Sequence, residues 1–383
     1  LYAEDDAAAA LLAGEAPVWR AGSCDGGHPR RCEATLTVTD LLGADDRLAP
    51  GEALAPQRRY DLPVSVWLPD GPGPFPVIVH GHGLSGDRGE AHATAEALDD
   101  LGFAVVAIDA PMHGDHPTAT TDADLLWVLQ LFGIDPTGGT FDPRVLRDQF
   151  RRAAWDEVQL TAAVRLDPDI DGDGVPDLDG GFVAWTGHSL GGLLGPHLLA
   201  LDPGVRGALL SVPGGRMSEI VHTSQTFAPL IALMAPSGAT QGAIDRFFPL
   251  LQTAIERGDP ATWAGRLTAA GQDVLVTQVI DDTIIPNPCT HHLARALGVE
   301  HAGPVLQPVD GLRLASGEGP WRANVGGVTA ALWQYDVAHE RGAEIDAEHT
   351  NIFDADEHVT QMREFVRALR DEGRGVVVDG GGR

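Results

Sequence analysis

The stretch that decides the fold reads Gly187-His188-Ser189-Leu190-Gly191-Gly192 and follows the apolar run at 182–186. After it, leucines recur at helical spacing. This order predicts a buried strand, a tight turn that carries one serine, and a helix. So sharp a turn strains the backbone at the serine and leaves no room beside it, which makes the flanking glycines a steric requirement. The N-terminus of the helix offers N–H groups and a partial positive charge, both of which stabilise an oxyanion.

Short apolar runs that alternate with helical stretches predict a mostly parallel sheet with helices on both faces. The expected parallel strands lie at 77–79, 104–108, 182–186, 205–212, 273–280 and 330–335. Alternating runs at 35–39 and 62–68 predict an antiparallel hairpin that opens the sheet. The predicted fold class is therefore α/β.

The two ends of the chain show no apolar pattern strong enough to predict that they are buried in the core. We interpret residues 1–34 as an N-terminal extension and residues 35–383 as a single α/β domain, with disorder expected from 373 onward.

A long apolar insertion, residues 213–272, separates two of the expected strands, and its side chains recur at helical spacing. At the carboxyl edge of a sheet such an insertion predicts a helical cap, or lid, over a site. The expected substrate-binding residues in it are Phe227, Leu230, Phe247 and Phe248. An alternative is that these are ordinary helices packed on the core, which would show part of the same helical spacing of apolar residues.

A serine hydroxyl becomes a strong nucleophile when a histidine removes its proton and a carboxylate orients that histidine. Asp282 follows a predicted strand, and His349 lies in the loop before the last helix. The chain order Ser189, Asp282, His349 therefore predicts a catalytic triad. Asp281 is expected to point elsewhere, and His358, at the start of the last helix, is expected to face solvent or cap that helix.

The sequence His80-Gly81-His82-Gly83 ends the first parallel strand. Serine hydrolases place an oxyanion donor at this position. We expect the backbone N–H groups of His82 and Leu190 to form the oxyanion hole. His113 and His116 follow the next strand, but a turn explains them and no metal is expected there.

An aspartate-rich loop precedes the serine strand and contains Asp169, Asp171, Asp173 and Asp177. Alternating aspartates with glycine at the sharp turn are typical of calcium loops. An EF-hand is excluded because Gly180 stands where its twelfth-position glutamate would be. We expect a structural calcium ion here and no cofactor for catalysis. A solvated acidic turn stays an open alternative.

Net charge, apolar runs and cysteine positions exclude several classes of protein. The net charge of −29 over 383 residues excludes nucleic acid as a partner, since phosphates require clustered basic residues. No apolar run approaches the roughly 18 residues of a membrane span, so no transmembrane segment is expected. Cys24 and Cys32 lie close together, which favours a disulfide and an oxidising compartment over two free thiols.

The order of Ser189, Asp282 and His349, with the His-Gly-His-Gly run upstream, resembles the α/β-hydrolase superfamily from about residue 35 onward. Further strings are similar to bacterial extracellular lipases of the virulence-factor type; they lie at 187–192, 212–215, 258–263, 282–287 and 349–354. This resemblance implies secretion or a place in the cell envelope, a lidded site, and a small-molecule or lipid ester as substrate, with transient contact with a lipid surface. Pro196 in the serine helix and the aspartate-rich loop depart from the family pattern.

We expect a serine carboxylesterase or lipase that works through an acyl-enzyme on Ser189. A polyester, thioester or peptide hydrolase with the same triad is an open alternative, because fold alone cannot separate these substrates. A non-catalytic, calcium-stabilised surface protein on a hydrolase scaffold is a second alternative, although the complete triad counts against it. A serine at the nucleophile position excludes a haloalkane dehalogenase, whose chemistry requires a carboxylate there.

Overall fold

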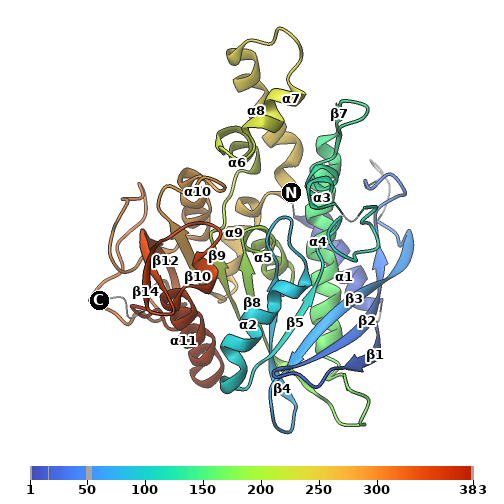
Figure 1. Cartoon of the computed structure of the whole chain (residues 1–383), viewed down its shortest axis with the longest axis vertical. Coiled ribbons are helices and arrows are strands. Elements are labelled where there is room, and N and C mark those ends of the chain that lie inside the picture. Colours follow the sequence, from blue (N-terminus) through green and yellow to red (C-terminus); the bar gives the residue numbers. More distant parts are fainter. Residues whose placement is uncertain (1, 16, 49–53, 122, 381–383) are drawn as a thin grey trace.

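A computed structural model of the chain describes residues 2–15, 17–48, 54–121 and 123–380. These residues form a ten-stranded central sheet with helices on both faces (Figure 1). The order of its strands is β1-β2-β3-β5-β4-β8-β9-β10-β12-β11. Its strands are β1 (Val18–Cys24), β2 (Arg30–Asp40), β3 (Arg58–Leu68), β4 (Phe75–Gly81), β5 (Ala104–Ile108), β8 (Leu178–His188), β9 (Gly207–Ser211), β10 (Asp273–Val279), β11 (Glu300–His301) and β12 (Ala330–Tyr335). The strands from β5 to β11 in this order are parallel, whereas β1, β2 and β3 are antiparallel to their neighbours. The expected fold class and the opening hairpin are confirmed.

The helices divide between the two faces of the sheet and the edge above it. One face carries α4 (Pro143–Val164), α5 (Leu190–Leu201), α9 (Pro260–Ala269) and α10 (Asn287–Leu297), and the other carries α2 (Ala91–Leu98) and α11 (Asp356–Glu372). The others are α1 (Ala3–Gly14), α3 (Asp124–Leu131), α6 (Met217–Thr223), α7 (Ala228–Met234) and α8 (Gln241–Ile255). Two short hairpins pair β6 (Ile134–Asp135) with β7 (Thr140–Phe141) and β13 (Val337–Glu340) with β14 (Ala343–Asp346).

The parallel strands are buried on both faces because successive side chains point to opposite sides of a strand. On β4, Val77 and Val79 belong to the core that α4 and α5 cover, and Ile78 belongs to the core that α2 and α11 cover. This double burial explains why such strands read as continuous apolar runs in the sequence.

The expected N-terminal extension is part of the fold, because β1 and β2 extend the central sheet and the boundary at 34/35 falls inside β2. Helix α1 packs on α4 with Ala8 and Leu12 buried, and the buried guanidinium of Arg151 binds Asp5 at 2.7 Å. This helix is not visible as an apolar pattern in the sequence, because it buries two alanines, one leucine and an aspartate that is held by an ion pair. A disulfide joins Cys24 to Cys32 at the end of β1, as predicted.

The C-terminal segment is ordered as well, contrary to expectation. Val376 and Val377 are buried, and Val377 pairs through both backbone hydrogen bonds with Trp321. Residues 381–383 of the expected tail lie outside the described residues.

The insertion at 213–272 has two parts. Helix α9 belongs to the body of the protein, since Trp263 and Leu267 are fully buried and the helix packs on α5 and α10. Helices α7 and α8 project from the body at the top of Figure 1, beside the segment of α3 and β7. The cap is thus smaller than the insertion.

The order of the strands places the site. After β4 the chain adds β5 on one side, and it later adds β8 on the other side of β4. Parallel sheets bind ligands at the carboxyl ends of the two strands where the order reverses in this way. Here those ends lead to His82, after β4, and to Ser189, after β8.

Candidate active site

Ser189 lies at the junction of β8 and α5 in a strained backbone conformation, with φ 51° and ψ −106°. The strain fits the predicted turn, which points the hydroxyl away from the sheet. A Cβ atom on Gly187 would lie 2.3 Å from the carbonyl oxygen of Gly191, and one on Gly191 would lie 2.0 Å from that of Gly81. Only glycine therefore fits at both positions. Helix α5 continues through Pro196, the residue that departs from the family pattern.

The three predicted triad residues are joined by hydrogen bonds. Nε2 of His349 lies 2.8 Å from Oγ of Ser189, and Nδ1 of His349 lies 2.7 Å from Oδ2 of Asp282. All three side chains are almost completely buried. An anionic acceptor at Nδ1 fixes the proton on that nitrogen and leaves Nε2 free to accept the serine proton.

The loop after β10 orients Asp282, whose other oxygen, Oδ1, accepts hydrogen bonds from the backbone N–H groups of Ile284 at 2.8 Å and Ile285 at 2.9 Å. Asn287 holds this loop to the sheet: its Oδ1 accepts from the N–H of Asp281, and its Nδ2 donates to the carbonyl of Val279. Asn287 is a positioning residue that the sequence analysis did not identify. An asparagine five residues after the predicted triad aspartate, at the start of a helix, was the available signal.

The two predicted oxyanion donors lie on adjacent segments, His82 in the loop after β4 and Leu190 at the start of α5. The carbonyl of His82 accepts a 2.9 Å hydrogen bond from the N–H of Gly191, which ties the loop after β4 to the first turn of α5 beside Leu190. The imidazole of His82 is fixed as well. Its Nε2 accepts from the N–H of Ala110 at 2.9 Å, so its Nδ1 carries the proton and donates to the carbonyl of Gly83 at 2.8 Å.

Two further histidines, the buried His80 and the partly buried His188, lie beside the triad. Burial lowers the pKa of His80 to about 3 and lowers the pKa of His188 well below its ordinary value, so both imidazoles are neutral near pH 7. The ring of His188 packs 5.5 Å from that of His349 and 5.3 Å from Phe353. Because the neighbouring His188 ring is neutral, it would not repel a positive charge on His349 if that imidazole took the proton of Ser189.

Three other histidines from the sequence analysis lie away from the triad contacts. His358 is completely buried against Phe353 and Tyr335, so the expected solvent-facing or capping role is wrong. His113 contacts the carbonyl of Pro111, and His116 contacts Asp156 and Thr118.

A cavity of about 530 Å³ opens next to the triad, and both polar and apolar side chains line it. Ser189 and His349 form one wall, and Glu90, Thr350 and Asp354 bring polar groups to the others. We call this space the polar cavity. Phe227, one of the predicted substrate-binding residues, is buried and lines both the polar cavity and a smaller space at the serine.

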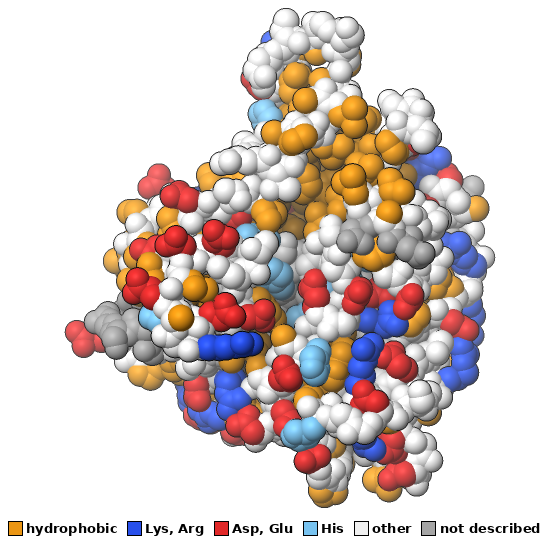
Figure 2. Space-filling view, in the orientation of Figure 1, with side chains coloured by type: hydrophobic (Ala, Val, Ile, Leu, Met, Phe, Trp, Pro, Cys, Tyr) orange, Lys and Arg blue, Asp and Glu red, His pale blue; other side chains and the backbone are white. Residues whose placement is uncertain are grey.

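A second cavity, of about 470 Å³, lies between the cap and the segment that carries α3 and β7. Figure 2 shows apolar side chains gathered in the hollow at this place. Leu230, Phe247 and Phe248 line it, so three predicted substrate-binding residues share a wall that does not include Ser189. We call this space the apolar chamber. Its opposite wall contains Phe132 and Phe141, which the sequence analysis passed over because the segment around them is rich in Asp, Thr and Gly.

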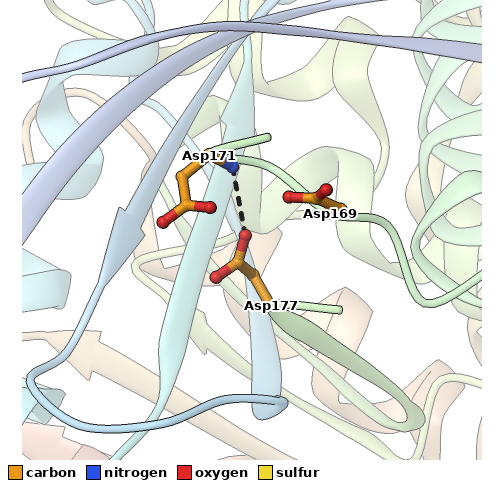
Figure 3. Close-up of side chains that lie close together, drawn as sticks. All are labelled: Asp169, Asp171 and Asp177. Carbon is orange, nitrogen blue, oxygen red and sulfur yellow. Dashed lines mark hydrogen bonds between the residues drawn. The ribbon is translucent and has the colours of Figure 1, made fainter. Parts of the chain in front are cut away.

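The aspartate-rich loop brings carboxylate oxygens of Asp169, Asp171 and Asp177 within 4.8 Å of one another (Figure 3). Oδ2 of Asp177 accepts from the N–H groups of Ile170 and Asp171, and Oδ2 of Asp171 is paired with Arg30 at 2.9 Å. Asp173 is outside this group; its Oδ1 accepts from the N–H of Val175 instead. The loop therefore assembles three of the four predicted ligands and already pairs one of them with an arginine.

Comparisons place this architecture among solved structures. Acetyl xylan esterase 1 from Thermoanaerobacterium sp. JW/SL YS485 is similar at 18% identity and a TM-score of 0.52, over 77% of this chain and 84% of that one. The chain has the α/β-hydrolase fold. An acetyl xylan esterase from Paenibacillus sp. R4 gives 17% identity and a TM-score of 0.48, over 76% of this chain and 83% of that one. The 2,6-dihydroxy-pseudo-oxynicotine hydrolase gives 13% identity and a TM-score of 0.47, over 83% of this chain and 67% of that one.

The likeness to acetyl xylan esterase 1 establishes the α/β-hydrolase fold and leaves the substrate open. No protein-family model matches the sequence, and the comparison with curated proteins finds no match. The narrower resemblance to extracellular lipases stays a prediction. Within the described ranges, no helix is both long and apolar enough to cross a membrane.

Proposed function

We propose that this protein is a serine carboxylic-ester hydrolase of the carboxylesterase or lipase type. The observation that carries the proposal is the hydrogen-bonded chain from Ser189 through His349 to Asp282, held at the strand-order reversal of an α/β-hydrolase sheet. A scaffold protein without activity would have no need of this geometry.

The reaction follows from the protons that these residues can move. Oγ of Ser189 attacks the ester carbonyl while its proton passes to Nε2 of His349, and Asp282 stabilises the imidazolium. The N–H groups of His82 and Leu190 receive the negative charge on the carbonyl oxygen. Collapse of the tetrahedral intermediate breaks the bond to the alcohol, which takes the proton from His349. Water then attacks the acyl-enzyme by the same steps and releases the carboxylic acid and free serine.

Esters of apolar acids fit the surroundings best, because apolar side chains dominate the cap side of the serine. Thioester, polyester and peptide bonds would use the same groups, and these stay as alternatives within the same mechanism. A substrate panel that contains all four bond types separates them by their relative kcat/KM.

Two further expectations belong to this proposal. The disulfide between Cys24 and Cys32 supports a location outside the reducing cytoplasm, in the cell envelope or secreted. The carboxylates of Asp169, Asp171 and Asp177 support a structural calcium ion remote from the ester chemistry.

The proposal is tested with p-nitrophenyl esters and with a fluorophosphonate probe, which forms a covalent bond only with an activated serine. The wild-type protein should hydrolyse the esters and carry the label on Ser189. Ser189→Ala should abolish labelling and lower kcat by a factor of roughly 10⁴ or more. Ser316→Ala, at an exposed loop serine, is the matched control and should retain full activity. Absence of both labelling and hydrolysis in the wild type would overturn the proposal.

A further inference from the structure

A narrow space joins the two large cavities at the serine. Its volume is about 30 Å³, and its walls include Ser189 and Leu190. It shares Phe227 with the polar cavity, and it shares Phe132 and Val221 with the apolar chamber. We call it the neck. The neck therefore lies between the triad and the chamber beneath the cap and borders both large cavities.

Aromatic contacts across the apolar chamber join two segments that are distant in sequence. The rings of Phe132 and Phe227 lie 5.4 Å apart at the neck, and those of Phe141 and Phe247 lie 6.3 Å apart. Every residue that lines the chamber is glycine, alanine, proline or a larger apolar residue. Its volume of about 470 Å³ lies within the range of roughly 300–1,000 Å³ typical of small-molecule sites. Such a chamber suits an apolar occupant without charges or hydrogen-bonding groups.

The triad determines which part of an ester faces which cavity. His349 must protonate the departing alcohol, and His349 lines the polar cavity. Leu190, an expected oxyanion donor, lines the neck instead. A carbonyl carbon at Oγ of Ser189 with its alcohol toward His349 therefore directs its acyl chain into the neck.

We propose that the apolar chamber is the acyl-chain site of the enzyme and that Phe132 and Phe227 form a gate to it. The inference rests on the proposed function, because it assigns the two halves of the ester substrate. A neck of about 30 Å³ holds about one water molecule, so a chain passes only when one of the two rings turns aside. The substrate class is an ester of an unbranched medium or long acyl chain with a small or polar alcohol.

Chain length is the direct readout. Each methylene that enters the chamber should raise kcat/KM about fourfold, the fold-change that corresponds to about 0.8 kcal/mol of buried methylene. The rise should begin once the chain reaches past the gate and should stop when the chamber is full. A shallow site beside the serine would instead give the highest kcat/KM with acetate.

Two substitutions fill different parts of the path. Val221→Trp places a large ring at the neck, and Ala243→Trp places one in the first turn of α8, near the α7–α8 connection at the top of Figure 1. Leu233→Trp is the matched control, since Leu233 is 69% exposed on α7 and does not line the chamber. The measurement is kcat/KM for p-nitrophenyl acetate, butyrate, octanoate and laurate, with thermal melts to verify folding.

The expected results differ for each variant. Val221→Trp should lower the ratio of octanoate to acetate kcat/KM by tenfold or more. Ala243→Trp should lower the laurate ratio several-fold and affect butyrate little, and Leu233→Trp should match the wild type. Because Ala243 is exposed, that variant tests the chamber even if Val221→Trp fails to fold. If the folded variants keep wild-type ratios, the acyl-site proposal is overturned while the ester-hydrolase proposal stands. If the wild type hydrolyses no ester, the proposed function itself has failed.

Discussion

The N–H of Gly191 donates a 2.9 Å hydrogen bond to the carbonyl oxygen of His82. This bond joins the loop that carries His82 to the first turn of α5, which carries Leu190, so it links the segments of both expected oxyanion donors. The His82 imidazole continues the connection, because it also binds the N–H of Ala110 after β5. One residue thus aligns three loops at the carboxyl edge of the sheet.

His82→Ala should lower kcat by roughly 10- to 100-fold with a small change in KM, because loss of the ring releases the loop that aims an oxyanion donor, and such donors matter most in the transition state. His92→Ala is the control, with a half-exposed side chain on α2. Steady-state kinetics with one p-nitrophenyl ester gives both constants. A change confined to KM would assign His82 to substrate binding rather than to positioning.

Gly191→Ala should lower the free energy of unfolding by roughly 1–3 kcal/mol and abolish most activity, since the new Cβ would lie 2.0 Å from the carbonyl oxygen of Gly81 and force α5 away from β4. Gly14→Ala places its Cβ in open space at the end of α1 and should be neutral or slightly stabilising. Urea denaturation compares the two. Equal stability of the two variants would contradict the close packing at the serine turn.

His349→Ala should reduce kcat by roughly 10⁴ or more, and Asp282→Asn by roughly 10³–10⁴, because the first removes the base and the second its orienting carboxylate. Circular dichroism should show an unchanged fold. The fluorophosphonate probe should label both variants slowly. Rapid labelling of His349→Ala would mean that another group activates the serine.

His358 should make the protein less stable in mild acid. Burial lowers its pKa to about 4, so between about pH 6.5 and pH 4 the unfolded state binds a proton that the folded state does not. The stability is present above the unfolded pKa and is lost as the pH falls through this window. Between pH 7 and pH 5 the wild type should lose about 2 kcal/mol more than His358→Leu in urea unfolding. Parallel pH curves for the two proteins would rule out this contribution.

Calcium should raise the melting temperature if the aspartate-rich loop binds it, since a ligand that binds only the folded state stabilises that state by mass action. Asp171→Asn should remove the effect, and Asp45→Asn, in a different loop, should keep it. Scanning calorimetry with excess calcium or a chelator measures the shift. Because Arg30 already pairs with Asp171, identical melting curves in both conditions would identify the loop as an arginine-paired acidic turn.

The parts predicted well from the sequence are those that local rules control. The alternation of buried strands and helices, the glycines around Ser189, and the positions of Asp282 and His349 after their strands all follow from short segments. The glycines follow from the steric limits of the turn. The positions of Asp282 and His349 follow from the rule that parallel strands bring their carboxyl ends to one edge of the sheet.

The parts predicted poorly depend on partners distant in the chain. Helix α1 is anchored by Asp5 to Arg151, a contact across 146 positions that leaves no periodic signal. His358 looked like a solvent-facing residue at the start of a helix, but Phe353 and Tyr335 enclose it. Burial of a polar residue becomes visible only when the neighbours are in place.

The sequence alone determined the arrangement at the serine: a serine on a turn that only glycine permits, followed in order by an aspartate and a histidine. The tertiary structure alone decided the shape of the space around it. The wall opposite the cap comes from Phe132 and Phe141, which lie between β5 and α4 in a segment for which the sequence predicted no helix or strand. The physical reason is that a turn is fixed by sterics between adjacent residues, whereas a cavity is what remains after distant side chains pack.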